Sequence, residues 1–124
     1  MKRDSYNPGE VCWIDCGTDM AKGPAFYAKL FGWTKAEAME SPAGIYQLFA
    51  TGDAPVGGMM TKMPQMPASF WLYYFNVPGL DAAIGRVKSA GGRIMNGPMQ
   101  VPGGSWIAQC ADPQGAMFAM VGPK

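Results

Sequence analysis

The sequence predicts a single α+β domain, residues 1–124, built from two βαβββ modules. A length of 124 residues is enough for one hydrophobic core and too short for two ordinary domains. Signals for a strand, a helix and three further strands occur in the same order in both halves of the chain. The glycines that would end the two helices, Gly32 and Gly91, are about 60 residues apart, which indicates an internal repeat. An ordinary α+β domain with coincidental spacing is the alternative.

The first module is predicted over residues 8–63. Its opening strand is the apolar segment 11–16, which is rich in β-branched and aromatic residues and stops at Gly17. Three more strand candidates follow the helix and are bounded by turn residues. They are expected at 35–40, 46–50 and 56–60, the last two being separated by a turn at Gly52–Asp53.

The helix of the first module comes directly after the opening strand. Thr18 and Asp19 offer an N-cap, and Pro24 is tolerated if it lies in the first helical turn. Large apolar side chains then recur at helical spacing until Gly32, which would stop the helix. These side chains are Phe26, Tyr27, Leu30 and Phe31. The pattern predicts an amphipathic helix with an aromatic face.

A linker at residues 64–67 separates the first module from the second, which is predicted over residues 68–122. The second module opens with the aromatic segment 70–77, which has the composition of a strand. An apolar stripe over residues 80–90, with Asp81 near its start, predicts the second helix. Three further strands are expected at 93–95, 106–110 and 116–121.

Composition and charge exclude several classes of partner. Charged residues make up 15% of the chain and the formal net charge is +1, so no charged surface for nucleic acid or anionic lipid is expected. The basic N-terminus is not followed by the apolar stretch of a signal peptide, and no apolar run approaches membrane-spanning length. We therefore expect a cytoplasmic protein that contacts neither nucleic acid nor membrane.

The chain contains no histidine. This removes the usual general base at neutral pH, the commonest metal ligand, and every nucleophile that depends on a neighbouring imidazole. Any chemistry must come from carboxylates, tyrosine, lysine, cysteine or the backbone.

Three segments together resemble the vicinal-oxygen-chelate proteins, the glyoxalase, bleomycin-resistance and dioxygenase group. Asp19, followed by Ala25-Phe26-Tyr27 and by Leu30-Phe31-Gly32-Trp33, resembles the first helix of that family. Residues 77–92 resemble the second helix, and Asp112-Pro113-Gln114-Gly115 resembles the turn before the last strand. The resemblance implies paired βαβββ modules, whose strands form a curled mixed sheet around a cleft. It also implies assembly as a homodimer.

Enzymes of this family usually bind a divalent metal through His or Glu on the first and last strand of each module. The corresponding positions here are Cys12 or Trp13, Phe70, Ala119, and a residue near Gly58 or Met60. None of these is a histidine or a carboxylate, so the usual iron, zinc or nickel site cannot be assembled there. We expect no metal and no other cofactor.

The cysteines do not replace those ligands. Three cysteines without framework spacing indicate reduced thiols. On one strand, Cys12 and Cys16 would lie about 13 Å apart, too far for a shared zinc ion or a disulfide. Burial as small hydrophobic residues is the first interpretation, and a redox or nucleophilic thiol is the second.

Strand alternation predicts which side chains face the cleft. Val77 should meet the second helix, so the even-numbered residues of its strand should face the cleft. An unpaired carboxylate is costly in an apolar layer, so Asp15 and its face-mate Trp13 should also face the cleft. A shift of one residue would instead place Cys12, Ile14 and Cys16 on the cleft face. The predicted ligand-binding residues are Trp13, Asp15, Met60, Phe70, Leu72, Tyr74, Asn76, Met117 and Ala119.

This aromatic and thioether wall suits a flat, largely apolar small molecule, so a metal-free binding protein is the first hypothesis. The second is a glyoxalase-like lyase or dioxygenase-like enzyme, either metal-free through Asp15 or Tyr74 or with atypical metal ligands. Asp15 is the candidate catalytic residue, because a carboxylate with a raised pKa beside Trp13 could act as a general base. The third hypothesis is an interaction module whose cleft is filled by its own side chains.

Overall fold

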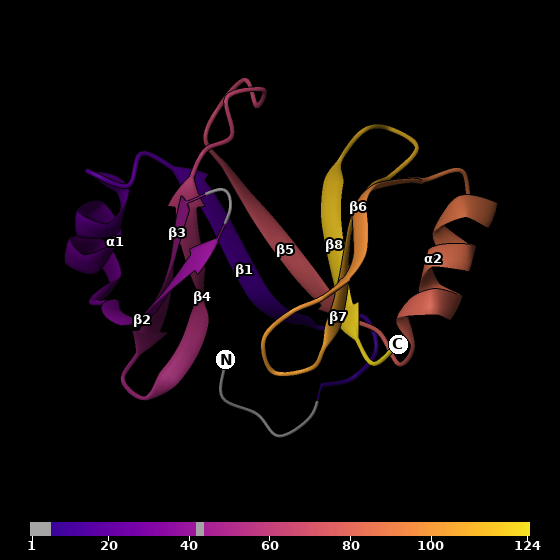
Figure 1. Ribbon diagram of the computed structural model, residues 1–124, viewed down its shortest axis with the longest axis horizontal. Coiled ribbons are helices and arrows are strands. Elements are labelled where there is room, and N and C mark those ends of the chain that lie inside the picture. Colours follow the sequence, from indigo (N-terminus) through magenta and orange to yellow (C-terminus); the bar gives the residue numbers. More distant parts are fainter. Residues whose placement is uncertain (1–5, 42–43) are drawn as a thin grey trace. The chain divides into compact units, whose positions relative to one another are not determined.

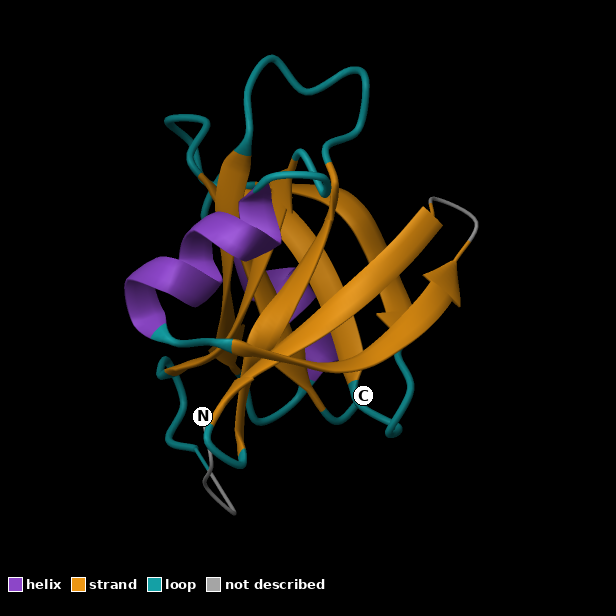
Figure 2. Ribbon diagram, turned by 90° about the vertical axis from the view of Figure 1, so that its left-hand side faces the viewer, coloured by secondary structure: helices purple, strands orange, loops and turns teal. Residues whose placement is uncertain are grey.

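The computed structural model describes residues 6–41 and 44–124. Its elements follow the order β-α-β-β-β twice, and Figure 2 shows the helices in purple and the strands in orange. In chain order they are β1 (Val11–Thr18), α1 (Gly23–Phe31), β2 (Thr34–Ser41), β3 (Gly44–Thr51), β4 (Ala54–Thr61), β5 (Phe70–Asn76), α2 (Leu80–Ser89), β6 (Arg93–Gln100), β7 (Trp106–Ala111) and β8 (Met117–Gly122) (Figure 1). The predicted α+β fold of two βαβββ modules is confirmed.

Packing divides the chain into two compact units. The first contains Trp13–Trp71, and the second contains residues 6–12 together with Leu72–Lys124. The division therefore falls within β1 and within β5. The module limits expected from the sequence, with a linker at 64–67, remain predictions.

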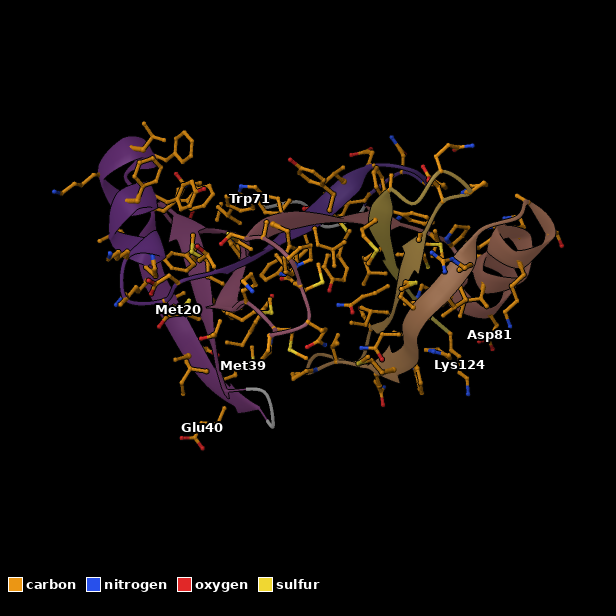
Figure 3. All side chains as sticks on the ribbon, turned by 90° about the horizontal axis from the view of Figure 1, so that it is seen from above. Met20, Met39, Glu40, Trp71, Asp81 and Lys124 are labelled. Atoms are coloured by element: carbon orange, nitrogen blue, oxygen red, sulfur yellow. The ribbon has the colours of Figure 1, made fainter. Side chains whose placement is uncertain are left out.

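The first unit contains the strand order β2-β3-β4-β1. β1 runs parallel to β4, whereas β2, β3 and β4 are joined by antiparallel pairs. Its core is formed by Cys16, Phe49 and Met59. Half-buried side chains from α1 and its surroundings pack against this core, and two of them are labelled in Figure 3. They are Met20, Tyr27, Trp33 and Trp71.

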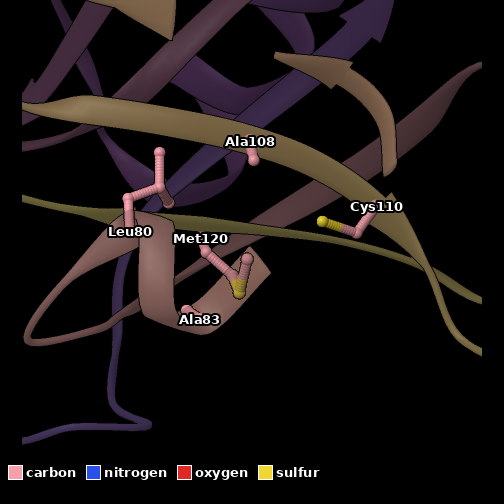
Figure 4. Packing of buried hydrophobic residues seen from close by; sticks show 5 residues of the cluster. All are labelled: Leu80, Ala83, Ala108, Cys110 and Met120. Carbon is pink, nitrogen blue, oxygen red and sulfur yellow. The ribbon is translucent and has the colours of Figure 1, made fainter. Parts of the chain in front are cut away.

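The second unit repeats this topology with the order β5-β8-β7-β6. β5 runs parallel to β8, and the other two pairs are antiparallel. α2 packs its apolar stripe on the sheet, where the buried residues form one cluster (Figure 4). The cluster consists of Leu80, Ala83, Ala108, Cys110 and Met120. At the chain end, the ammonium group of Lys124 lies 4.8 Å from the ring centre of Trp106.

The predicted N-cap of the first helix is wrong. α1 begins at Gly23, with Lys22 in the N-cap position and without a side-chain cap. Asp19 instead forms a separate turn, because its carboxylate accepts the N–H of Ala21 at 2.8 Å and its carbonyl accepts the N–H of Gly23 at 2.7 Å. Pro24 lies in the first helical turn, as predicted. The predicted stop at Gly32 is also confirmed, since this residue is left-handed with φ 72°.

β6 is longer than expected. The sequence predicted a strand over residues 93–95 only. The strand continues to Gln100 through register shifts on either side of Asn96. These irregularities accommodate the proline, which cannot donate to the sheet.

No helix among the described residues is long and apolar enough to cross a membrane.

Candidate functional site

A buried carboxylate lies on the sheet face of the first unit that is turned away from α1. Asp15 is 6% exposed. Its Oδ1 accepts hydrogen bonds from the Tyr46 hydroxyl and, at 3.2 Å, from the indole Nε1 of Trp13. The same indole N–H is shared with the Tyr46 hydroxyl oxygen, 2.8 Å away. We call Trp13, Asp15 and Tyr46 the Asp15 cluster.

Strand alternation places the Asp15 cluster. Cys16 packs into the core beneath α1, so Asp15 must project from the opposite face of β1. The core position of Cys16 agrees with the burial expected for it beneath the helix, and a ligand cleft on the Asp15 face stays a prediction.

Gly58 makes room for the Asp15 cluster. It lies between β1 and β3, opposite Asp15 on one side and Leu48 on the other. A Cβ atom at Gly58 would lie 2.0 Å from Cζ of Tyr46. The tyrosine ring therefore reaches Asp15 across a position that must have no side chain.

The Asp15 cluster holds a carboxylate oxygen between two hydrogen-bond donors. The Tyr46 hydroxyl and the Trp13 indole both donate to the same carboxylate oxygen of Asp15. The cluster can therefore keep a carboxylate in a defined orientation in a largely apolar setting.

Two more predicted residues belong to the same face of the first unit. Met60 is opposite Gly17 in the pairing of β1 with β4. Phe70 lies against Gly17, where an added Cβ would be 2.4 Å from the phenylalanine ring. Both side chains are half-buried. The first unit thus brings Trp13, Asp15, Met60 and Phe70 onto one face.

The second unit has a related arrangement around Ala119. This residue is opposite Tyr74 of β5 and opposite Gln109 of β7. The Gln109 side-chain amide donates to the Tyr74 hydroxyl at 3.1 Å. The oxygen of that amide is 3.4 Å from the donating nitrogen of Asn96. Ala119 thus corresponds to Gly58: it is a small residue on the last strand of its unit, and the side chains of Tyr74 and Gln109 form a hydrogen bond beside it.

The remaining predicted residues differ in their exposure. Leu72 and Tyr74 are each 4% exposed and Ala119 is fully buried, whereas Met117 is 42% exposed. The Asn76 amide donates to the backbone carbonyl of Tyr6 at 2.9 Å, so it holds the segment that leads into β1.

Sequence reasoning missed Tyr46 and Gln109. Both belong to predicted strands, but their partners are fixed by cross-strand register. Two signals were available in the sequence. Gln109 is a lone polar residue within the apolar segment 106–110, and the pair Gly57-Gly58 leaves space that the Tyr46 ring can fill.

The family profile of the Glyoxalase/Bleomycin resistance protein/Dioxygenase superfamily matches residues 16–120. The chain belongs to this superfamily. It is 36% identical over 118 residues to a putative glyoxylase of Mycobacterium tuberculosis, covering 93% of this chain and 44% of the relative. It is 32% identical over 130 residues to an anthracycline biosynthesis protein of Streptomyces peucetius, covering 93% of this chain and 47% of the relative. The chain thus spans about half the length of these curated relatives.

Solved structures support the fold. A hypothetical protein of Bacillus halodurans superposes with a TM-score of 0.71 at 14% sequence identity. The match covers 94% of this chain and 95% of that protein. At this identity the likeness establishes the fold alone.

The side chains at the family's ligand positions do not fit a divalent metal. Gly58 and Ala119 offer no donor atom, and Phe70 offers only a ring. The remaining position, Cys12, carries a thiol whose Sγ lies 3.7 Å from the carbonyl oxygen of Tyr74. Burial is the main cause that raises the pKa of this thiol, which disfavours the thiolate that a metal would need. Within the described ranges, no three His, Cys, Asp or Glu side chains are grouped as a metal site.

The three cysteines are free thiols. Burial, with a smaller contribution from the Asp15 charge, raises the pKa of Cys16 to about 11, and burial raises the pKa of Cys110. Such thiols stay protonated at neutral pH and are poor nucleophiles. Cys16 and Cys110 lie in the two cores, in agreement with burial as small hydrophobic residues.

Proposed function

We propose that this chain binds a small, largely apolar or aromatic molecule without a metal or other cofactor. The observation that carries the proposal is the Asp15 cluster over Gly58. In this unit, hydrogen-bonded side chains occupy the region in which related enzymes would present metal ligands.

The residue types on this face of the first unit support a flat ligand. Trp13, Met60 and Phe70 are half-buried on one sheet face, so each retains surface for apolar contact. Aromatic faces and a thioether can stack on and adapt to a planar molecule. The Asp15 cluster supplies the few polar atoms that fix orientation in such sites.

The second unit contributes in a different way. Leu72, Tyr74 and Ala119 are buried, so we assign them to shaping and supporting the binding face. Met117 is exposed and is the predicted residue of this unit with the most surface for contact. We further propose that the protein acts as a homodimer.

Tryptophan fluorescence titration in the presence of a chelator tests the proposal. The name of the Streptomyces relative makes an anthracycline the first compound to try, followed by other flat aromatic molecules. We expect saturable quenching that Tyr46→Phe weakens by about tenfold, because the Asp15 carboxylate loses the hydroxyl that orients it. Tyr73→Phe is the matched control, since Tyr73 is 48% exposed and lies on the face of β5 opposite to that of Phe70 and Leu72.

Two outcomes would overturn the binding proposal. One is quenching that appears only when a divalent metal is added. The other is an equal effect of Tyr46→Phe and Tyr73→Phe, which would separate binding from the Asp15 cluster.

A metal-free enzyme is the second candidate function. The close contact of the Tyr46 hydroxyl with Asp15 favours it, because a carboxylate linked to a hydroxyl can move a proton. Tyr74 is the other candidate from the sequence, but it is buried in the second unit. The name of the mycobacterial relative makes glyoxalase-type substrates the first to test.

Solvent exchange distinguishes the enzyme from the binder. With chelator and deuterated water, a general base would exchange the acidic C–H proton of the substrate, and Asp15→Asn would abolish that exchange. Saturable binding without exchange would leave the binding protein as the function.

A further inference from the structure

A groove lies on the α2 side of the second unit, and none of its lining residues is one of the family's ligand positions. Its volume is about 380 Å³. This is within the range of roughly 300–1,000 Å³ that small-molecule sites occupy. The groove is lined by Val77, Ala83, Arg86, Val87, Ala90, Gly92, Asp112, Pro113, Phe118 and Met120.

The floor of the groove is apolar and belongs to the core. Ala83 and Met120 are members of the buried cluster in Figure 4, and Val77, Val87 and Phe118 pack against that cluster. Small residues border it, because Ala83 on α2, Ala90 at the C-cap of that helix and Gly92 after it present little side chain. The groove therefore exists because α2 packs on the sheet with few large residues at this end.

Two charged residues give the groove its polar character. Arg86 is its cation and Asp112 its anion. Oδ1 of Asp112 accepts the backbone N–H groups of Gln114 and Ala116, each at 2.9 Å, so this carboxylate is engaged in its own turn. In the part of the chain that the structure describes, no acceptor engages the guanidinium group of Arg86.

We propose that this groove binds a carboxylate with an apolar chain, such as a medium-chain fatty acid. The chain would cover Val77, Val87 and Phe118, and the carboxylate would pair with Arg86. A guanidinium group presents parallel N–H donors that match a carboxylate. The charge of Asp112 disfavours a dianion, so an alkyl phosphate should bind less well.

An NMR titration with decanoate, kept below its micelle concentration, tests this proposal. We expect saturable shifts of backbone amide signals from residues 83–92 and 112–120. Arg86→Gln should weaken binding by about tenfold, whereas Lys88→Gln should leave it unchanged. Lys88 is the matched control because it is exposed on the same helix, carries the same charge and does not line the groove.

Further probes separate the apolar and charged parts of the site. Ala90→Trp should block decanoate by filling the groove, and decan-1-ol, which has no charge, should bind more weakly than decanoate. Asp15→Asn should leave decanoate binding unchanged, so failure here is distinguishable from failure of the proposed function.

The inference is wrong if decanoate shifts no signals in the two segments, or if Lys88→Gln weakens binding as much as Arg86→Gln. Tighter binding of decyl phosphate than of decanoate would overturn the assignment to carboxylates.

Discussion

Two of the smallest residues lie where the family resemblance predicts metal ligands. Gly58 and Ala119 lie on the last strand of their units, each beside a hydrogen-bonded tyrosine. The sequence predicted that Trp13 and Asp15 share a face of their strand, and the two side chains do contact each other, because alternation along one strand requires only local information. It did not predict that Tyr46 pairs with Asp15 or that Gln109 pairs with Tyr74, because a side-chain pair across strands depends on register, which one sequence does not reveal.

Replacing Gly58 by alanine should disrupt the Asp15 cluster. The new Cβ would overlap the end of the Tyr46 ring, which can swing away only by giving up its hydrogen bonds. We expect a loss of about 1–3 kcal/mol in the free energy of unfolding and altered Trp13 fluorescence. Denaturant unfolding measures the first effect.

Gly85→Ala is the control for this variant. Gly85 lies within α2 with nothing within 4 Å of an added Cβ, so alanine there should stabilise the protein by about 0.5–1 kcal/mol. A Gly58→Ala protein as stable as the wild type would contradict the role assigned to Gly58.

The thiol of Cys16 should make stability depend on alkaline pH. In the folded protein the pKa of this thiol is raised to about 11 from an ordinary value of 9.0, mainly by burial. The unfolded thiol therefore ionises first, and its contribution to stability is present below about pH 9 and is lost as the pH rises to about 11. The total is on the order of 2 kcal/mol.

Denaturant unfolding of the wild type and Cys16→Ala at a series of pH values isolates this effect. The stability difference between the two proteins should shrink across that pH window. A constant difference from neutral to alkaline pH would show that the thiol is not shielded as the structure indicates.

At the scale of elements, the pattern of apolar residues was sufficient to predict both helices and all eight strands. The start of α1 was not predictable from residue type, because Asp19 can serve either as an N-cap or as a turn residue. Which of the two roles Asp19 takes depends on where the helix begins. The helix begins at Gly23, next to Pro24, so Asp19 lies too far upstream to cap it and forms a turn of its own. The length of β6 was missed because its neighbour β7 supports the strand beyond Gly97 and Pro98.

Asp19→Ala should cost about 1 kcal/mol in the free energy of unfolding, because the Ala21 N–H loses its acceptor. Asp19→Asn keeps a side-chain oxygen and should cost less. Chemical denaturation of both variants provides the measurement. An equal loss for asparagine and alanine would mean that the charge of Asp19, and not its turn, matters.

At the scale of the whole molecule, the repeat of about 60 residues identified two modules without any structural information. The sequence alone shows that it contains no histidine, and no carboxylate at the positions where the family resemblance predicts metal ligands. The groove beside α2 was not predictable, since it arises from helix packing. Because the chain spans about half of its curated relatives, the activity of those longer proteins does not transfer directly to it.

Metal dependence most directly tests the proposal that this chain binds its ligand without a metal. Elemental analysis of the purified protein should find no stoichiometric metal, and Zn²⁺, Ni²⁺, Mn²⁺ or Fe²⁺ should not raise its melting temperature. A ligand that binds only the folded state must stabilise it, so thermal shifts report specific metal binding. One metal ion per chain, with a thermal shift that Asp15→Asn removes, would contradict the claim and identify Asp15 as an atypical metal ligand.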